Sequence, residues 1–305
     1  MTPVTSPAPP LPGRSRSRFS LLVGSILVGA FLMCALLAPG ISAWLGDDPY
    51  TQVAPRSVTP PTPPTARNWL GTDALGRDLL SRLLYGARIS LEVGVLAEVI
   101  ALAIGTALGA AAGYTGGRID AFLMRCTDLV LAFPAPLLAL AIIATVPEPD
   151  TAPLLRVLPH PSVGVVFLVL GCLGWGGIAR LVRAEFLRLR EQEFAQAAQA
   201  MGAGGVRVVL RHLLPNALRP LIVAGTLGIG GNILMESWLS FLGVGARPPL
   251  PSWGTMVTEG QEYFLARPWV CLSPGLAILL VVLGFNLLGD AIGDRLDPRR
   301  NRAVA

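Results

Sequence analysis

Three polar residues stand within long stretches of sequence that are otherwise almost uncharged: Glu98, Asn232 and Glu236. If such a stretch crosses a bilayer, an ionised carboxylate near its middle costs several kcal/mol unless it faces protein or water. Glu98 lies about nine residues into its stretch, which is roughly 13 Å along a helix. Two roles remain open for it: a cavity-lining carboxylate that attracts a cationic or amine-bearing solute, or a carboxyl buried at a subunit contact. Glu236, close to Asn232, is predicted to be a pathway residue or a helix-packing residue.

A second stretch of chemical interest is EFAQAAQAMGAGGVRVVLRHLLPN, residues 193–216. Its Ala-rich beginning, residues 193–200, favours a helix. Gly202 is predicted to end that helix in a left-handed backbone conformation, which other residues adopt only at a cost.

The second half of this stretch predicts another short helix at residues 206–214. Arg207 and Arg211 are four residues apart and therefore lie on one side of it. Pro215 suits the first turn of the helix that follows, because it has no N–H to donate. The whole stretch therefore predicts a rigid pair of short helices that exposes small residues and arginine.

Other kinds of site are not indicated by the sequence. His160 and His212 are predicted on opposite sides of a membrane and cannot build one metal site. The run GTALGAAAGYTGG, residues 105–117, lacks the Gly-Lys-Ser/Thr ending of a phosphate-binding loop. The four cysteines have no CxxC spacing and are predicted to be buried free thiols: Cys34, Cys126, Cys172 and Cys271. Because no nucleophile–base set appears either, we expect no cofactor, no metal and no enzyme activity in this chain.

The composition indicates a membrane protein. The 305 residues are 52% hydrophobic and only 14% charged, with a mean hydropathy of +0.60; soluble domains carry about a quarter charged residues. The net charge is +5, and all 24 basic residues are arginine. These arginines form no single dense patch, so a nucleic-acid partner is not expected.

Six intervals are long and apolar enough, or nearly so, to cross the roughly 30 Å hydrocarbon core of a bilayer: residues 19–45, 89–114, 129–146, 162–178, 218–243 and 269–289. In hydrocarbon the backbone must satisfy its own hydrogen bonds, so each interval is predicted to be a helix. The fold class predicted is thus an all-α integral membrane protein with six transmembrane helices.

The predicted organisation has five parts. Residues 1–18 form a disordered basic tail and residues 19–45 the first transmembrane helix. Residues 46–88 form an outer Pro-rich connector followed by an amphipathic helix, in which leucines alternate with Arg77, Asp78 and Arg82. Residues 89–293 hold the other five helices, with the loop of interest at 180–216. A second tail occupies residues 294–305.

The distribution of arginine predicts the orientation. With the N-terminus inside, sixteen arginines fall in inner segments and eight in outer segments. Inner loops of membrane proteins are enriched in basic residues. Both termini and the 180–216 loop are therefore predicted to lie in the cytoplasm.

Five blocks, in consistent order between about residues 68 and 299, resemble the permease subunits of binding-protein-dependent ABC importers. AQAAQAMGAGGVRVVLRHLLPN is similar to their EAA loop. The others resemble the peptide/nickel branch: WLGTDALGRDLLSRLLYGARISL, DLVLAFPAPLLALA, TLGIGGNILMESWLSFLGVGARPPLPSWG and FNLLGDAIGDRLDPR. The resemblance implies the transmembrane fold of a type I ABC importer in a bacterial inner membrane.

In that family the loop is a coupling helix that sits in a groove of a cytoplasmic ATPase. The resemblance assigns ATPase coupling here to a set of loop residues: Glu193, Gln196, Ala197, Ala198, Gly202, Arg207, Arg211, Leu214 and Pro215. Gln196 departs from the usual Glu, which weakens a charge-assisted contact to a neutral hydrogen bond; Glu193, on nearly the same face, is a candidate to replace it. Glu98 departs from the family too, since its position is normally apolar.

The resemblance further implies a second homologous permease subunit, cytoplasmic ATP-binding subunits and an extracytoplasmic substrate-binding protein. Dipeptides and oligopeptides are the expected cargo; nickel complexes or other small solutes are the alternative. A secondary transporter driven by an ion gradient is the alternative of another class, because Glu98 and Glu236 could supply its intramembrane carboxylates. Such transporters often contain internal repeats, and no convincing repeat appears in this sequence.

Overall fold

A computed structural model describes residues 14–45, 48–54, 59–146 and 160–296. The described residues are almost entirely helical, and only two isolated β-bridges occur among them. The longer helices are α1 (Arg14–Leu45), α2 (Leu79–Thr115), α3 (Gly117–Ala132), α4 (Ala135–Thr145), α5 (Pro161–Arg190), α8 (Leu214–Phe241) and α10 (Pro268–Leu296). Four short elements complete the set among the described residues: α6 (Glu193–Ala200), α7 (Gly205–Val208), the π-helix η3 (Val209–Leu213) and α9 (Trp253–Gln261). The predicted all-α membrane fold is confirmed.

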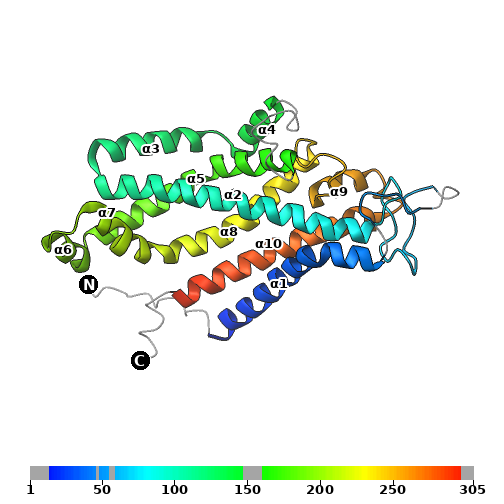
Figure 1. Cartoon of the computed structure of the whole chain (residues 1–305), viewed down its shortest axis with the longest axis horizontal. Helices are drawn as coiled ribbons and strands as arrows, with labels where there is room; N and C mark the ends of the chain where they lie inside the picture. The colour runs from blue at the N-terminus through cyan, green and yellow to red at the C-terminus, as the bar shows by residue number, and fades with distance from the viewer. Residues whose placement is uncertain (1–13, 46–47, 55–58, 147–159, 297–305) are drawn as a thin grey trace, which may run out of the picture.

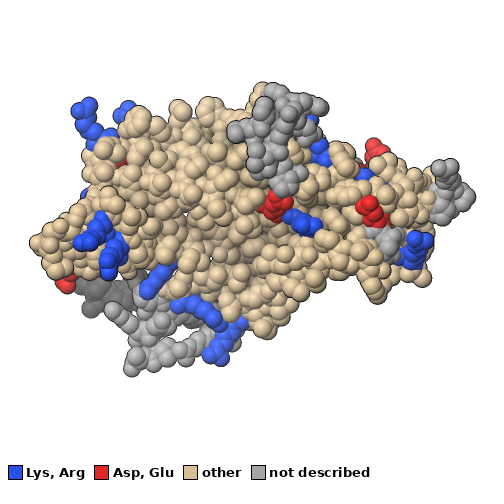
Figure 2. Space-filling model, in the orientation of Figure 1, with Lys and Arg blue, Asp and Glu red and all other residues tan. Residues whose placement is uncertain are grey.

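The helices run lengthwise, so that functional segments gather at two ends of the molecule (Figure 1). The helices α6 and α7 lie at one end, and the first described residues of α1 and the last of α10 form the ends of those two helices that point towards it. The connector before α2 lies at the opposite end, and α4 and α9 lie towards it. On the face in Figure 2, charged side chains gather towards these ends and a broad uncharged surface separates them.

The third predicted span is broken rather than straight. Where one helix was predicted over residues 129–146, α3 and α4 meet at an 83° bend. The bend falls at Phe133 and Pro134, both in extended conformations. Proline lacks an N–H and disfavours a helical residue before it, so the helix must stop here. Within the part of the chain that the structure describes, five helices are long and apolar enough to cross a membrane, or six if this bent pair forms one span.

The predicted amphipathic surface helix is wrong. Helix α2 begins at Leu79, where Asp78 accepts a hydrogen bond from the backbone N–H of Ser81 at 2.7 Å, and continues unbroken to Thr115. Asp78 and Arg82 are only 2% and 1% exposed. The charged side chains therefore face the protein interior, and the segment is the buried first part of the second span.

Part of each predicted tail belongs to a helix in the structure. Residues 14–18, assigned to a disordered tail, belong to α1, and residues 294–296 belong to α10. The remaining tail residues, 1–13 and 297–305, lie outside the described part of the chain.

Glycines let α2 and α5 pack closely. A Cβ atom added at Gly105, Gly109 or Gly113 would meet α5 within 2.8 Å. These three glycines are spaced by four residues, which is the small-residue pattern of close helix contacts in membranes. At Gly109 the obstacle is the backbone oxygen of Ala179 at 2.5 Å, which no rotamer change can relieve. The glycine-rich run at residues 105–117 is therefore a surface for helix packing.

We expect Gly109→Ala to lower the free energy of unfolding by about 2 kcal/mol, because overpacking a tight interface forces the two backbones apart. Thermal unfolding of the purified protein in detergent measures this change. The matched control is Gly177→Ala on α5, where an added Cβ meets nothing within 4 Å. It should be neutral or mildly stabilising, since alanine is the better helix former; equal destabilisation by both variants would contradict the packing argument.

Candidate functional site

The α6–α7 segment is a compact knob at one end of the molecule. Ala195 and Ala198 of α6 are 0% and 3% exposed, and Ala195 belongs to one buried cluster with Leu189 of α5 and Ala217 of α8. Met201 caps the helix, and Gly202 follows with a φ of +83°. The left-handed conformation predicted for Gly202 is confirmed.

The second predicted helix of this segment is not separate. Only Gly205–Val208 form α7, and residues Val209–Leu213 form a π-helical turn that leads directly into α8. Pro215 occupies the first turn of α8 as predicted. Pro215 has no N–H, and its ring crowds the preceding turn. The helix therefore widens into a π-helical turn there instead of ending.

The knob is anchored from two sides. Gly205 lies against Tyr114 at the end of α2, where an added Cβ would stand 2.8 Å from the phenol oxygen. On the other side, Ala195 of α6 belongs to the same buried cluster as Leu189 at the end of α5. Val208 and Leu213 are fully buried. The segment is thus packed against α2 and α5.

Its outer surface presents the residues assigned to coupling. Among the predicted coupling residues, Ala198 is buried and Leu214 is half-buried, while the others are exposed: Glu193, Gln196, Ala197, Gly202, Arg207, Arg211 and Pro215. The Gln196 amide donates to the backbone oxygen of Glu191 at 3.2 Å. Glu193, in the first turn of α6, has the helix position that best suits a negative charge.

The predicted pathway residues lie along the contact between α2 and α8, which we call the α2–α8 seam. Asn232 donates from its side chain to Glu98 at 2.9 Å, so the structure brings these two together. Glu98 is 5% exposed and fills the space above Gly228, where an added Cβ would stand 2.2 Å from its carboxylate oxygen.

Glu236 lies further along the same seam in a separate network of serine hydroxyls. Ser90 of α2 donates to it at 3.0 Å and Ser240 of α8 at 2.7 Å. Ser90 in turn accepts from the backbone N–H of Trp253, and Ser240 accepts from Ser252. One carboxyl group, 1% exposed, therefore joins α2, α8 and α9.

Sequence reasoning missed a closed ring of four charged side chains at the beginning of α2, the end that lies away from the α6–α7 knob. Asp73 contacts Arg77 at 2.6 Å and Arg82 at 3.1 Å, and both arginines contact Glu259 of α9 at 3.0 Å. Asp73, Arg77 and Arg82 are 2%, 6% and 1% exposed. The sequence does carry a signal of this ring, because several charged residues stand just before an apolar span. The same pattern also fits an exposed amphipathic helix, which is the interpretation given above.

No cofactor or metal site emerges from the described residues. They contain no group of three or more His, Cys, Asp or Glu side chains placed to hold a metal ion. Glu98 and Glu236 instead accept hydrogen bonds across the contact between α2 and α8, which links these two helices.

A multi-pass bundle with polar residues between its spans and a rigid knob at one end defines a membrane transport subunit. The chain belongs to the family described as binding-protein-dependent transport system inner membrane components, which residues 105–302 match. It is 40% identical over 278 residues to a dipeptide transport system permease protein of Alkalihalophilus pseudofirmus, covering 91% of this chain and 85% of that one. The predicted class, a permease subunit of a multi-pass inner-membrane transporter, is confirmed.

Two further comparisons bear on the fold and the family. An oligopeptide transport system permease protein of Bacillus subtilis is 34% identical over 286 residues, covering 94% of this chain and 88% of the relative. A solved structure of the MetNI methionine ABC transporter, inward facing, aligns with a TM-score of 0.54 at 21% identity. It covers 70% of this chain and 96% of the other, and confirms the fold.

Proposed function

We propose that this chain is the permease subunit of an ATP-driven importer of dipeptides or oligopeptides. The observation that carries the proposal is the 34–40% identity to dipeptide and oligopeptide permeases over more than nine-tenths of the chain. The α6–α7 knob supports it, because an importer driven by a separate ATPase needs a rigid element that receives motion.

The proposed partners are a second homologous permease subunit, cytoplasmic ATP-binding subunits and an extracytoplasmic substrate-binding protein. The α6–α7 end would face the cytoplasm together with both termini. Two features support this orientation. The first is the excess of arginine in the segments assigned to the inside. The second is that the first described residues of α1 and the last of α10 form the ends of those helices that point towards α6 and α7 (Figure 1).

The knob would dock on the ATPase through α6 and the turn at Gly202. Small side chains on α6 permit close approach, and Glu193 supplies the charge that Gln196 lacks. The amide of Gln196 already contacts the backbone of Glu191, so this residue stiffens the knob. Motion received there would pass through the contacts of Gly205 and Ala195 into α2 and α5.

The α2–α8 seam is the proposed boundary of the solute pathway. Glu98, Asn232 and Glu236 hold the two helices together in this conformation through interhelical hydrogen bonds. Opening a pathway beside the seam would expose these groups to the solute. We therefore propose that they contribute to the pathway when the helices part, and to packing when the helices are closed.

The coupling role is tested by Gly202→Ser. A residue with a Cβ at φ +83° costs about 1–2 kcal/mol of backbone strain, which corresponds to about ten-fold in a conformational equilibrium. Because an added Cβ meets nothing within 4 Å, the effect is on backbone shape alone. We expect about ten-fold slower ATP-driven uptake in reconstituted vesicles, with ATP hydrolysis retained.

The matched control is Gly204→Ser, two residues away. Gly204 has a φ of −64° and is the N-cap residue of α7, a position that favours serine. Its uptake should equal that of the wild type. Normal coupling of hydrolysis to uptake in Gly202→Ser would refute the assignment of the knob.

A further inference from the structure

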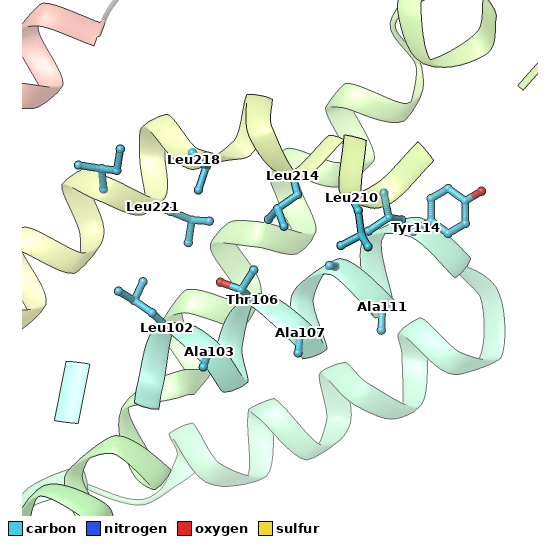
Figure 3. A pocket seen from close by; sticks show the side chains of 13 residues that line it. Leu102, Ala103, Thr106, Ala107, Ala111, Tyr114, Leu210, Leu214, Leu218 and Leu221 are labelled. Carbon is cyan, nitrogen blue, oxygen red and sulfur yellow. The ribbon is translucent and has the colours of Figure 1, made fainter. Parts of the chain in front are cut away.

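An apolar groove of about 740 Å³ runs between α2 and the beginning of α8 (Figure 3). One wall comes from α2 between Leu102 and Tyr114, and the other from Leu210, Leu214 and Leu218. Twelve residues of helix span about 18 Å, which is close to the roughly 15 Å depth of one bilayer leaflet. The groove is therefore about one leaflet deep.

The groove has a closed end and an open end. It closes where α2 and α8 converge, at the contact of Leu102 with Gly225, one turn from the Glu98–Asn232 pair. It opens toward the α6–α7 knob. Leu210 and Leu218 are 59% and 46% exposed, so the apolar wall is accessible from the surrounding membrane.

The open end is basic. Arg207, Arg211 and His212, which flank Val209 and Leu210 of the groove in sequence, line a second hollow of about 280 Å³ together with the turn at Gly202. Neither arginine forms an ion pair within the described part of the chain, where arginine ion pairs join other residues: Arg77, Arg82, Arg180, Arg183 and Arg188. A leaflet-deep apolar groove with unneutralised cations at its mouth has the charge and polarity of a site for an anionic amphiphile.

We propose that this groove holds one acyl chain of an anionic phospholipid of the inner leaflet, with the phosphate on Arg207 and Arg211. These two arginines would then contact the lipid instead of the ATPase, and docking on the ATPase would be left to α6 and the turn at Gly202. The inference rests on the proposed function, because it places the α6–α7 end in the cytoplasm. A bound lipid would fill the space between α2 and α8 directly beside the coupling knob. Its presence would resist closure of the groove, and the local lipid composition would thereby tune coupling.

An acyl chain fits the groove better than an extended peptide does. The lining contains only two side-chain polar groups, the hydroxyls of Thr106 and Tyr114. A peptide backbone placed there would leave its N–H and C=O groups without partners, which costs several kcal/mol for each group. A hydrocarbon chain requires no such partners.

The test uses the assembled transporter in nanodiscs of phosphatidylcholine containing a phosphatidylglycerol that carries a photoreactive acyl chain. After illumination, peptide mass spectrometry locates the label. We expect label on residues 102–114 and 209–222. Because each basic residue near an anionic lipid contributes about five-fold in affinity, the double variant R207Q/R211Q should lower this labelling about thirty-fold. Ala107→Trp, which fills the groove, should abolish it.

Two controls make the outcome decisive. Arg219→Gln removes an exposed arginine of α8 that lines neither hollow, and Ala121→Trp adds the same bulk on α3; both should label as the wild type does. Label elsewhere in the wild type, or equal loss in R219Q, would overturn the lipid site. So would label confined to permease subunits free of the complex, which would identify the groove as a subunit contact.

The same preparation separates this inference from the proposed function. A complex that lacks ATP-driven uptake, or that forms without an ATPase subunit, contradicts the proposed function whatever the label shows. A working complex with an unlabelled groove contradicts the lipid site alone.

Discussion

Asp73→Ala is expected to destabilise the protein by about 3–5 kcal/mol, the range for removing one partner of a buried ion pair. Asp73 is 2% exposed and contacts both Arg77 and Arg82. Its removal leaves two buried guanidinium groups with Glu259 as their shared ion-pair partner. Asp73 also accepts backbone hydrogen bonds from Leu75 and Arg77, so the turn before α2 loses its support as well.

The effect should reach α9, because Glu259 is the α9 member of the ring. Thermal unfolding in detergent gives the loss of stability, and limited proteolysis of the connector and α9 locates it. Asp128→Ala is the matched control: its pair with Arg180 is 61% and 54% exposed, and surface pairs contribute about 0–1 kcal/mol. A loss below about 1 kcal/mol for Asp73→Ala would show that the ring adds nothing to stability.

This ring illustrates why sequence reasoning misassigned the start of α2. Alternating leucines and charges have the same periodicity whether the charged face meets water or meets charges from another segment. Here the deciding partner, Glu259, is 177 residues away from Arg82. Local periodicity carries no information about such a partner, so the surface interpretation was the natural one and was wrong.

The spans and the knob were more predictable because their causes are local. Apolar length determines a spanning helix, and the left-handed turn at Gly202 follows from the missing Cβ of glycine itself. The break in the third span was also signalled, since Pro134 stands inside the interval 129–146. The prediction of one straight helix over this interval rests on its apolar length and takes no account of the proline.

For the polar residues of the α2–α8 seam, local sequence patterns do not reveal which side chains contact each other. Sequence position identified Glu98, Asn232 and Glu236 as unusual, but it did not show that Glu98 and Asn232 contact each other while Glu236 contacts serines. Serine is common in loops and helices alike, so Ser90 and Ser252 carried no signal of their own. Only packing of α2, α8 and α9 brings those hydroxyls to one carboxyl group.

Glu236→Ala should therefore lower stability by about 3 kcal/mol, because it leaves the buried hydroxyls of Ser90 and Ser240 without their acceptor and opens a cavity. ATP-driven uptake should fall with it, since α9 loses its link to the seam. The contrasting variant is Glu98→Gln, whose amide oxygen can still accept the hydrogen bond from Asn232, and we expect a change below about 1 kcal/mol. Thermal unfolding and vesicle uptake measure both variants. If neither variant changed stability, the α2–α8 seam would owe its stability to its glycines and apolar contacts alone. If Glu98→Gln slowed uptake and left thermal unfolding unchanged, Glu98 would act on the solute, whereas Glu236 would hold the helices together.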